Sequence, residues 1–254
     1  MDLKAFQLTG KNALVTGSRR GLGASIALAL AQAGANVACH GRSPAQDGIV
    51  EAIQSCGGKS FYISGDVADS AVCERIIETT VTQFGSVDIL VNNAGIIRRA
   101  PAIEFSAEDW NDILAVNLTA VFRLSQLAAR HMVQRGEGGK IVNIASLLSL
   151  QGGILVPAYA AAKAGVAQLT KAMANEWAVH GINVNAIAPG YMITDNTAAL
   201  RHDATRNRQI LERIPGGRWG NPEDLAGAAV FLCSSASDYV HGHVLAVDGG
   251  WLAR

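Results

Sequence analysis

Cysteine is scarce in this sequence, and no cysteines are paired in a motif. The four cysteines, Cys39, Cys56, Cys73 and Cys233, lie far apart and show no C-x-x-C spacing. This pattern argues against a zinc site and against a framework of disulfides. It predicts four reduced cysteines that take part in packing, and a functional site without a metal.

An excess of charge of either sign is also lacking. The chain of 254 residues has 21 Lys and Arg residues and 21 Asp and Glu residues, so its formal net charge is zero. This balance disfavours nucleic acids and acidic membranes as partners. The first residues lack the apolar core of a signal peptide, and no apolar run reaches the roughly 20 residues that span a bilayer. We therefore expect a cytoplasmic protein that acts on a small molecule.

Prolines are few, whereas glycines and apolar residues are plentiful. Only 6 prolines stand against 27 glycines, and 49% of the residues are hydrophobic. This composition excludes a disordered or fibrous chain. Because a chain of this length can bury one large core, residues 1–254 are predicted to form one domain.

A glycine-rich turn between an expected strand and an expected helix indicates a dinucleotide site. The apolar residues 13–15 lead into T-G-S-R-R-G-L-G at 16–23, and a helical pattern follows over 24–33. Glycines let a pyrophosphate approach the backbone, and the helix N-terminus offers it free N–H groups. The spacing departs from G-x-G-x-x-G, and a plain tight turn is the alternative. The cofactor candidates of this turn are Gly17, Ser18, Arg20, Gly21, Leu22 and Gly23.

The end of the second expected strand, residues 36–40, favours NADP(H) over NAD(H). An NAD site usually has an acidic residue at this point, which binds the ribose 2′-hydroxyl. Here Arg42 and Ser43 follow the strand, and the first acid is Asp47. The guanidinium groups of Arg20 and Arg42, with the Ser43 hydroxyl, suit a 2′-phosphate. NAD(H) stays the alternative, because either arginine can instead be solvated.

Strands and helices are expected to alternate along the rest of the chain. Strands are expected over 60–65, 87–91, 140–146, 183–188 and 243–247, and helices over 44–55, 70–84, 107–134, 157–180 and from 222. This alternation predicts a doubly wound α/β fold of the Rossmann type, a parallel sheet with helices on both faces. Asp69 and Ser106 are expected to cap two of the helices.

Ligands of such sheets bind at the carboxyl ends of the strands. The cofactor candidates at these ends are Asp66, Val67, Asn93, Ala94, Gly95, Pro189, Gly190, Met192 and Thr194. Asp66 can equally be a turn residue, and the asparagine can fasten the sheet rather than line the cofactor. The polar connection 191–217 is long, and long connections often act as lids, so we expect substrate recognition there.

A hydroxyl, a phenol and an amine stand close together near the middle of the chain. Tyr159 and Lys163 are four residues apart in an alanine-rich run that favours helix, so both face one side, one turn apart. The ammonium is placed to lower the phenol pKa by roughly 3 units, which takes about 4 kcal/mol. Ser146, after an apolar run, is placed to donate a hydrogen bond to a substrate oxygen. A surface contact between Tyr159 and Lys163 is the alternative.

These motifs occur together in one known family. Residues 16–23, Asn92-Asn93-Ala94-Gly95, Asn117, Ser146, Tyr159-x-x-x-Lys163 and Pro189-Gly190 resemble the short-chain dehydrogenase/reductase family over essentially the whole chain. The resemblance implies hydride transfer between a nicotinamide cofactor and an alcohol or ketone, usually in a homotetramer. It also implies that Tyr159 is the acid/base and that Lys163 binds the ribose and lowers the phenol pKa. Ser146 would orient the carbonyl, and Asn117 would position a water of a proton relay.

A narrower resemblance links the chain to sugar-acid dehydrogenases of this family. It is carried by residues 92–99, 149–153, 173–177, 185–192, 218–220 and 247–254. Such a substrate has a carboxylate, which Arg98 and Arg99 can pair with, unless they face solvent or a neighbouring subunit. Gln151 and Tyr191 are further substrate candidates. The rival functions are a reductase of 3-oxoacyl groups on a carrier protein or of another ketone, and a regulatory protein that binds the cofactor without catalysis.

Overall fold

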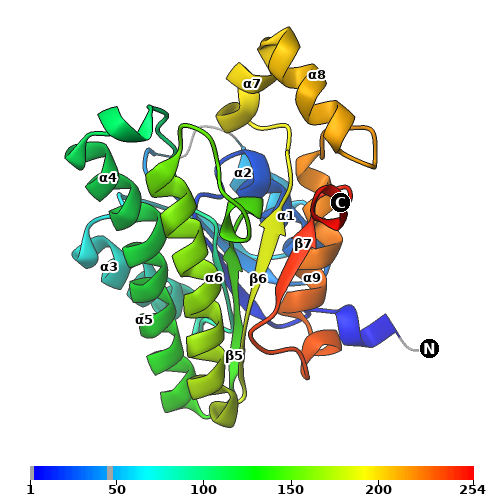
Figure 1. Cartoon of the computed structure of the whole chain (residues 1–254). Coiled ribbons are helices and arrows are strands. Elements are labelled where there is room, and N and C mark those ends of the chain that lie inside the picture. Colours follow the sequence, from blue (N-terminus) through cyan, green and yellow to red (C-terminus); the bar gives the residue numbers. More distant parts are fainter. Residues whose placement is uncertain (1–2, 45–47) are drawn as a thin grey trace.

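The structure, a computed structural model, describes residues 3–44 and 48–254 (Figure 1). Its helices are α1 Gly21–Gln32, α2 Ile49–Gln54, α3 Ser70–Phe84, α4 Ala107–Leu114, α5 Ala120–Arg135, α6 Pro157–Trp177, α7 Ala198–His202, α8 Ala204–Arg213 and α9 Ala226–Cys233. Its strands are β1 Asn12–Val15, β2 Asn36–Gly41, β3 Ser60–Ser64, β4 Ile89–Asn92, β5 Gly139–Ile144, β6 Ile182–Pro189 and β7 Val244–Val247. The expected alternation of strands and helices is confirmed, and α7 and α8 are additional to it. Asp47 and residues 45–47 of the helix expected over 44–55 lie outside the described residues.

The described strands form one parallel sheet in the order β3-β2-β1-β4-β5-β6-β7. The chain builds outward from β1 to β3 and then returns to place β4 on the other side of β1. Val15 of β1 is thereby in register with both Cys39 of β2 and Val91 of β4. In open α/β sheets a ligand binds at such a reversal of strand order. The doubly wound Rossmann-type fold is therefore confirmed, and it locates the expected cofactor site.

Helices cover both faces of the sheet, and each face has its own apolar cluster. Val15 packs in the cluster that includes Ile26 of α1 and Leu232 of α9, whereas Leu14 packs in the cluster that includes Ile76 of α3 and Leu124 of α5. Successive residues of a strand point to opposite faces, so a strand buried on both faces has a continuous apolar sequence. The unbroken run at 13–15 has this cause.

The long helix expected over 107–134 is present but not uniform. Ser106 caps its start by accepting a hydrogen bond from the Asp109 N–H at 3.1 Å, as expected. A π-helical turn, Ala115–Thr119, then separates α4 from α5. By length and composition alone the helix Ala107–Arg135 could cross a membrane, since its most apolar 18-residue window has a mean hydropathy of 1.2. Half of that window (50%) is buried within the fold, and one such helix among the described residues is weak evidence for a membrane span.

The connection 191–217 lies beyond the carboxyl end of β6. It contains α7 and α8, which stand above the sheet at the top of Figure 1. Asp203 separates the two helices and caps α8, since its carboxylate accepts from the Thr205 and Arg206 N–H groups, each at 3.0 Å. The helices hold polar side chains over the edge of the sheet where a ligand is expected.

Candidate active site

Two adjoining pockets open at the carboxyl edge of the sheet. The loop cleft, of about 430 Å³, is lined by the glycine turn at 17–23, the end of β2 and residues 93–96. The lid pocket, of about 400 Å³, lies between the ends of β5 and β6 and the connection 191–217. Tyr159 lines both pockets. A group on this side chain can therefore meet ligands bound in each of them.

The glycine turn is held against the end of β4. The side-chain amide of Asn93 donates to the carbonyl oxygens of Thr16 at 2.9 Å and Gly17 at 3.0 Å. Gly17 has a φ of +64°, and a Cβ placed on it would lie 2.9 Å from the Cα of Ala94. A side chain at Gly23 would collide with Asn93 and with the carbonyl of Gly17. These glycines are needed for close packing of backbone, and Asn93 fastens the turn.

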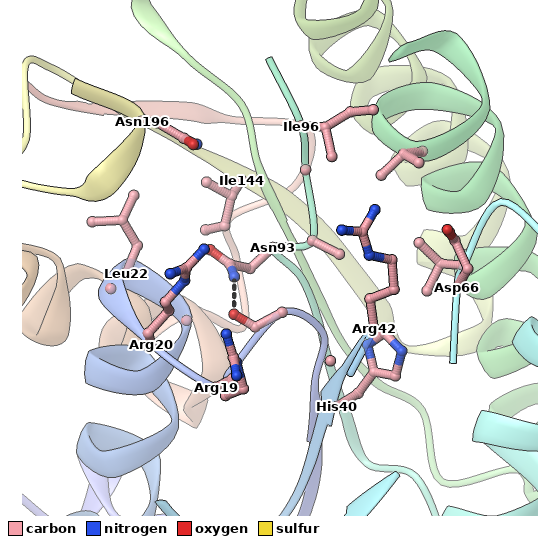
Figure 2. Close-up of a pocket in the computed structure, with 18 of the residues that line it drawn as sticks. Arg19, Arg20, Leu22, His40, Arg42, Asp66, Asn93, Ile96, Ile144 and Asn196 are labelled. Carbon is pink, nitrogen blue, oxygen red and sulfur yellow. Dashed lines mark hydrogen bonds between the residues drawn. The ribbon is translucent and has the colours of Figure 1, made fainter. Parts of the chain in front are cut away.

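Arginines gather around the loop cleft (Figure 2). Arg42 and Ser43 line it at the end of β2, as expected. Arg20 forms an ion pair with Asp195 of the connection 191–217, at 2.7 Å between two exposed groups. Arg19, which the sequence analysis missed, lines the cleft as Arg20 does.

Ser18 does not line either pocket. It is fully buried, and its hydroxyl oxygen accepts from the His40 N–H at 2.9 Å, which ties the glycine turn to β2. The predicted cofactor residues that do line the loop cleft are Gly17, Arg20, Gly21, Leu22, Gly23, Arg42, Ser43, Asp66, Val67, Asn93, Ala94, Gly95, Tyr159, Lys163 and Thr194. Asp66 also has the turn role, because its carboxylate accepts from the Ala68 N–H at 3.0 Å.

Tyr159, Lys163 and Ser146 meet where the two pockets join. Pro157 begins α6, and Lys163 lies one turn after Tyr159, with its Nζ 5.7 Å from the centroid of the phenol ring. Lys163 is 3% exposed, and its Nζ donates to the carbonyl oxygen of Ile144, at the end of β5, at 2.6 Å. Ser146 is the residue that follows β5 by two positions, and its hydroxyl oxygen accepts from the Leu148 N–H at 3.1 Å. The end of β5 and the start of α6 thus place all three groups.

Burial changes the acidity of the phenol and the ammonium in opposite directions. It raises the pKa of Tyr159 above 10.0, against which a hydrogen bond with Ser146 and the charge of Arg99 act. It lowers the pKa of Lys163 from 10.5 to about 8. The expected net lowering of the phenol pKa is therefore not found, because desolvation of the phenolate outweighs the favourable neighbours.

Asn117 lies in the π-helical turn and is fully buried. Its side-chain oxygen accepts from the Ile96 N–H, and its side-chain amide donates to the Ile96 carbonyl oxygen, both at 2.8 Å. A buried amide needs such partners, and π-turns often mark functional positions. The side chain thus fixes the segment that follows Asn93, while the relay role of Asn117 stays a prediction.

Replacing Asn117 with alanine is expected to destabilise the fold by about 2–4 kcal/mol, because the N–H and carbonyl of Ile96 lose their partners inside the protein. Urea unfolding followed by circular dichroism measures the change. Asn111→Ala, at an exposed position on α4, is the matched control and should change stability by less than about 0.5 kcal/mol. Equal midpoints for the two variants would contradict the structural role.

Arg98 and Arg99, the two arginines expected to bind the substrate, line different pockets. Arg99 lines it and donates from Nη2 to the carbonyl oxygen of Asn196 at 2.8 Å. Arg98 lines the loop cleft instead and pairs with Asp109 at 3.4 Å. The other predicted residues in the lid pocket are Gln151, Tyr191, Pro189, Gly190, Met192 and Thr194.

Residues far apart in the sequence complete the lid pocket. Trp251, near the C-terminus, donates from its indole N–H to the side-chain oxygen of Gln151 at 3.1 Å. The centroid of its ring lies 4.6 Å from that of the Tyr191 ring. The guanidinium carbon of Arg213 lies over the Trp251 ring, 4.1 Å from its centroid. Arg206 of α8 lines the pocket as well. No local spacing signals these contacts of Trp251, and the polar character of the connection 191–217 is the sequence signal for Arg206 and Arg213.

Comparisons with known proteins find relatives that match essentially the whole chain. The family model described as Enoyl-(Acyl carrier protein) reductase matches residues 17–252. The 2-dehydro-3-deoxy-D-gluconate 5-dehydrogenase of Dickeya dadantii (strain 3937) is 53% identical, with 100% of each chain covered. A solved Agrobacterium tumefaciens structure with bound NADP is 56% identical, has a TM-score of 0.93 and covers 98% of this chain and 99% of its own.

A further solved structure contains NADP and a second small molecule. It is a gluconate 5-dehydrogenase from Burkholderia cenocepacia J2315 in complex with NADP and tartrate, 42% identical, with a TM-score of 0.95 and 99% of both chains covered. These similarities extend over the whole sheet, the glycine turn and the helix with Tyr159. The protein belongs to the short-chain dehydrogenase/reductase family.

Proposed function

We propose that this protein is an NADP(H)-dependent dehydrogenase of sugar acids, acting on a substrate of the 2-dehydro-3-deoxy-D-gluconate or 2-deoxy-D-gluconate type. The observation that carries the proposal is the position of Tyr159 between a dinucleotide cleft and a pocket lined by arginines. The named relatives act on such acids, which supports the substrate class.

The residues of the loop cleft fit NADP(H). The glycine turn leaves room for a pyrophosphate against backbone, since Gly21 has a φ of +58° and a side chain there would meet only Thr194, at 3.8 Å. Arg42 and Ser43, directly after β2, supply donors that a 2′-phosphate requires, and Arg19 of the glycine turn lines the same cleft. Solved relatives contain NADP, which supports the same choice over NAD(H).

A nicotinamide bound in the loop cleft would supply the acceptor or donor of the hydride. The protein's own residues position the substrate and transfer the proton. Ser146 and Tyr159 face the lid pocket, where they can hold the oxygen of the reacting carbon by hydrogen bonds. Tyr159 takes the hydroxyl proton during oxidation and returns one during reduction. Lys163, at the floor of the loop cleft, supplies a positive charge beside the phenol and a donor for the ribose.

The same proposal includes a lid, an assembly and a location. Residues 191–217 act as the substrate lid, because they form one wall of the lid pocket. The working form is a cytoplasmic homotetramer; α5 supports a subunit interface, since it exposes Phe122 (39%) and Val133 (41%). Sedimentation equilibrium checks the assembly.

The structure weakens the carrier-protein alternative. That function needs an exposed basic patch for an acidic protein, yet Arg201 donates to the Thr194 carbonyl oxygen at 3.2 Å, Arg208 pairs with Glu212, and Arg206 and Arg213 line the lid pocket. A regulatory protein without catalysis has no need of Ser146, Tyr159 and Lys163 in one place.

One assay tests the proposed function against these rivals. Six-carbon sugar acids, their keto forms and acetoacetyl thioesters are offered with NADP(H) and with NAD(H), and nicotinamide absorbance is followed. We expect the highest kcat/KM for a sugar acid with NADP(H). Faster turnover of the thioesters would favour the carrier-protein reductase, and cofactor binding without any turnover would favour the regulatory protein.

A further inference from the structure

We propose that Arg206 and Arg213, on α8, form the subsite that binds the carboxylate of the substrate. This inference rests on the function proposed above and identifies the side chains that recognise the acid group. The sequence alone favours Arg98 and Arg99, after β4, for this role. The proposed carboxylate site lies instead on α8, in the connection 191–217.

The arginine side chains give the lid pocket a positive charge, which favours binding of an anion. Three arginines line it, Arg99, Arg206 and Arg213, and among the described residues of its wall there is no Asp, Glu, Lys or His. Three guanidinium groups around one cavity repel one another, and a bound carboxylate relieves this repulsion. A neutral sugar would leave it in place.

The arginines of α8 differ in their partners. Arg208 lies outside the pocket and pairs with Glu212, at 3.8 Å. The guanidinium of Arg206 donates to the neutral side-chain oxygen of Gln209, at 2.9 Å. In residues 3–44 and 48–254, neither Arg206 nor Arg213 forms an ion pair. Their charges are therefore left for a ligand.

Arg213 is held in one orientation by the aromatic residues of the pocket. Its guanidinium carbon lies 4.1 Å from the centroid of Trp251, and Trp251 is fixed in turn by Gln151 and Tyr191. Stacking on a ring occupies the face of a guanidinium and leaves the N–H groups of its edge free. Such an edge matches the two oxygens of a carboxylate.

The three arginines act on different side chains of the lid pocket. The charge of Arg99 lowers the pKa of Tyr159, whereas the charges of Arg206 and Arg213 lower that of Tyr191, although burial raises both phenol pKa values overall. Arg99 therefore acts on the proposed acid/base, and the α8 pair acts on another ring of the pocket. With its carboxylate bound by α8 and not by Arg99, the acid is expected to present a carbon remote from that carboxylate to Tyr159, so the inference predicts oxidation at C5 rather than C3.

The test compares one acid with its uncharged form. The sugar acid that the wild type turns over fastest and its primary amide are assayed with Arg206→Gln, Arg213→Gln and the double variant. We expect kcat/KM for the acid to fall about 10- to 100-fold for each arginine, while kcat/KM for the amide changes less than about threefold. Arg208→Gln, which removes the same charge outside the pocket, should leave both values unchanged.

Binding and product analysis complete the test. Calorimetry with the acid on a Tyr159→Phe background should show the same weakening without turnover, and NMR of the wild-type product should show a 5-oxo acid. The inference fails if the double variant keeps the wild-type preference for acid over amide, or if acid and amide lose activity equally. Absence of turnover of any sugar acid by the wild type would instead overturn the proposed function itself.

Discussion

Replacing Tyr159 with phenylalanine is expected to reduce kcat by about 10²–10⁴-fold, the usual contribution of a general acid or base. The ring that lines both pockets stays in place, and only the oxygen that exchanges the proton is removed. Because that oxygen acts chiefly in the transition state, the Kd for NADP should change by no more than about twofold.

Stopped-flow absorbance of the nicotinamide gives kcat, and fluorescence titration gives the Kd. Phe61→Tyr changes one aromatic hydroxyl in β3, outside both pockets. It shows how much kcat and Kd respond to an exchange between tyrosine and phenylalanine away from the site. A Tyr159→Phe variant that retained most of its kcat would remove Tyr159 from the chemistry.

Replacing Arg42 with aspartate is expected to reverse the cofactor preference. The change removes a guanidinium from the end of β2 and places a carboxylate there, which repels a 2′-phosphate and can accept from a ribose 2′-hydroxyl. The ratio of kcat/KM for NADP to kcat/KM for NAD should fall by about 10²–10³-fold.

Arg20→Ala provides the comparison for this variant. Since Arg20 pairs with Asp195 and both groups are exposed, its loss should change the same ratio by less than about threefold. Steady-state kinetics with both cofactors measures each ratio. An unchanged ratio in Arg42→Asp, or a larger shift in Arg20→Ala, would assign the 2′-phosphate to another residue.

The sequence predicts the fold well because its patterns are local and repeated. The run 13–15, the glycine turn after it and the helix that follows are each set by near neighbours, and their alternation fixes a parallel sheet. The order of the strands then brings Asn93 and Arg42 to the cleft without further information.

The choice between Arg19 and Arg20 depends on backbone detail that the sequence does not contain. Arg20 is the N-cap of α1, with an extended conformation (φ −155°, ψ 174°) that directs its side chain to Asp195. Arg20 and its neighbour Arg19 both line the cleft. The pairing of Arg20 with Asp195 joins two segments that are far apart in the sequence, so no local pattern predicts it.

Two other features depend on contacts between distant segments. The stacking of Arg213 on Trp251 joins α8 to the C-terminal residues, and no periodicity predicts it. The acidity of Tyr159 depends on how much water its ring loses, which follows from packing and not from the spacing to Lys163. For this reason the motif predicts the position of the pair but gives the wrong sign for the net shift of the phenol pKa.

The pH dependence of oxidation tests the central claim most directly, namely that Tyr159 and Lys163 exchange the proton as a pair. Loss of one proton from the pair prepares it to accept the proton of the substrate, so kcat/KM for oxidation should rise with pH. Burial lowers the pKa of Lys163 to about 8 and raises that of Tyr159 above 10.0. The pair is therefore expected to release its first proton with an apparent pKa near 8.

The measurement is the profile of kcat/KM for the sugar acid at saturating NADP, for the wild type and Lys163→Met. The wild type should show a rising limb with an apparent pKa near 8. In Lys163→Met that limb should be absent, and any remaining rise should lie above pH 10.0, because the buried phenol then titrates alone. A limb near 8 that persists in Lys163→Met would contradict the account.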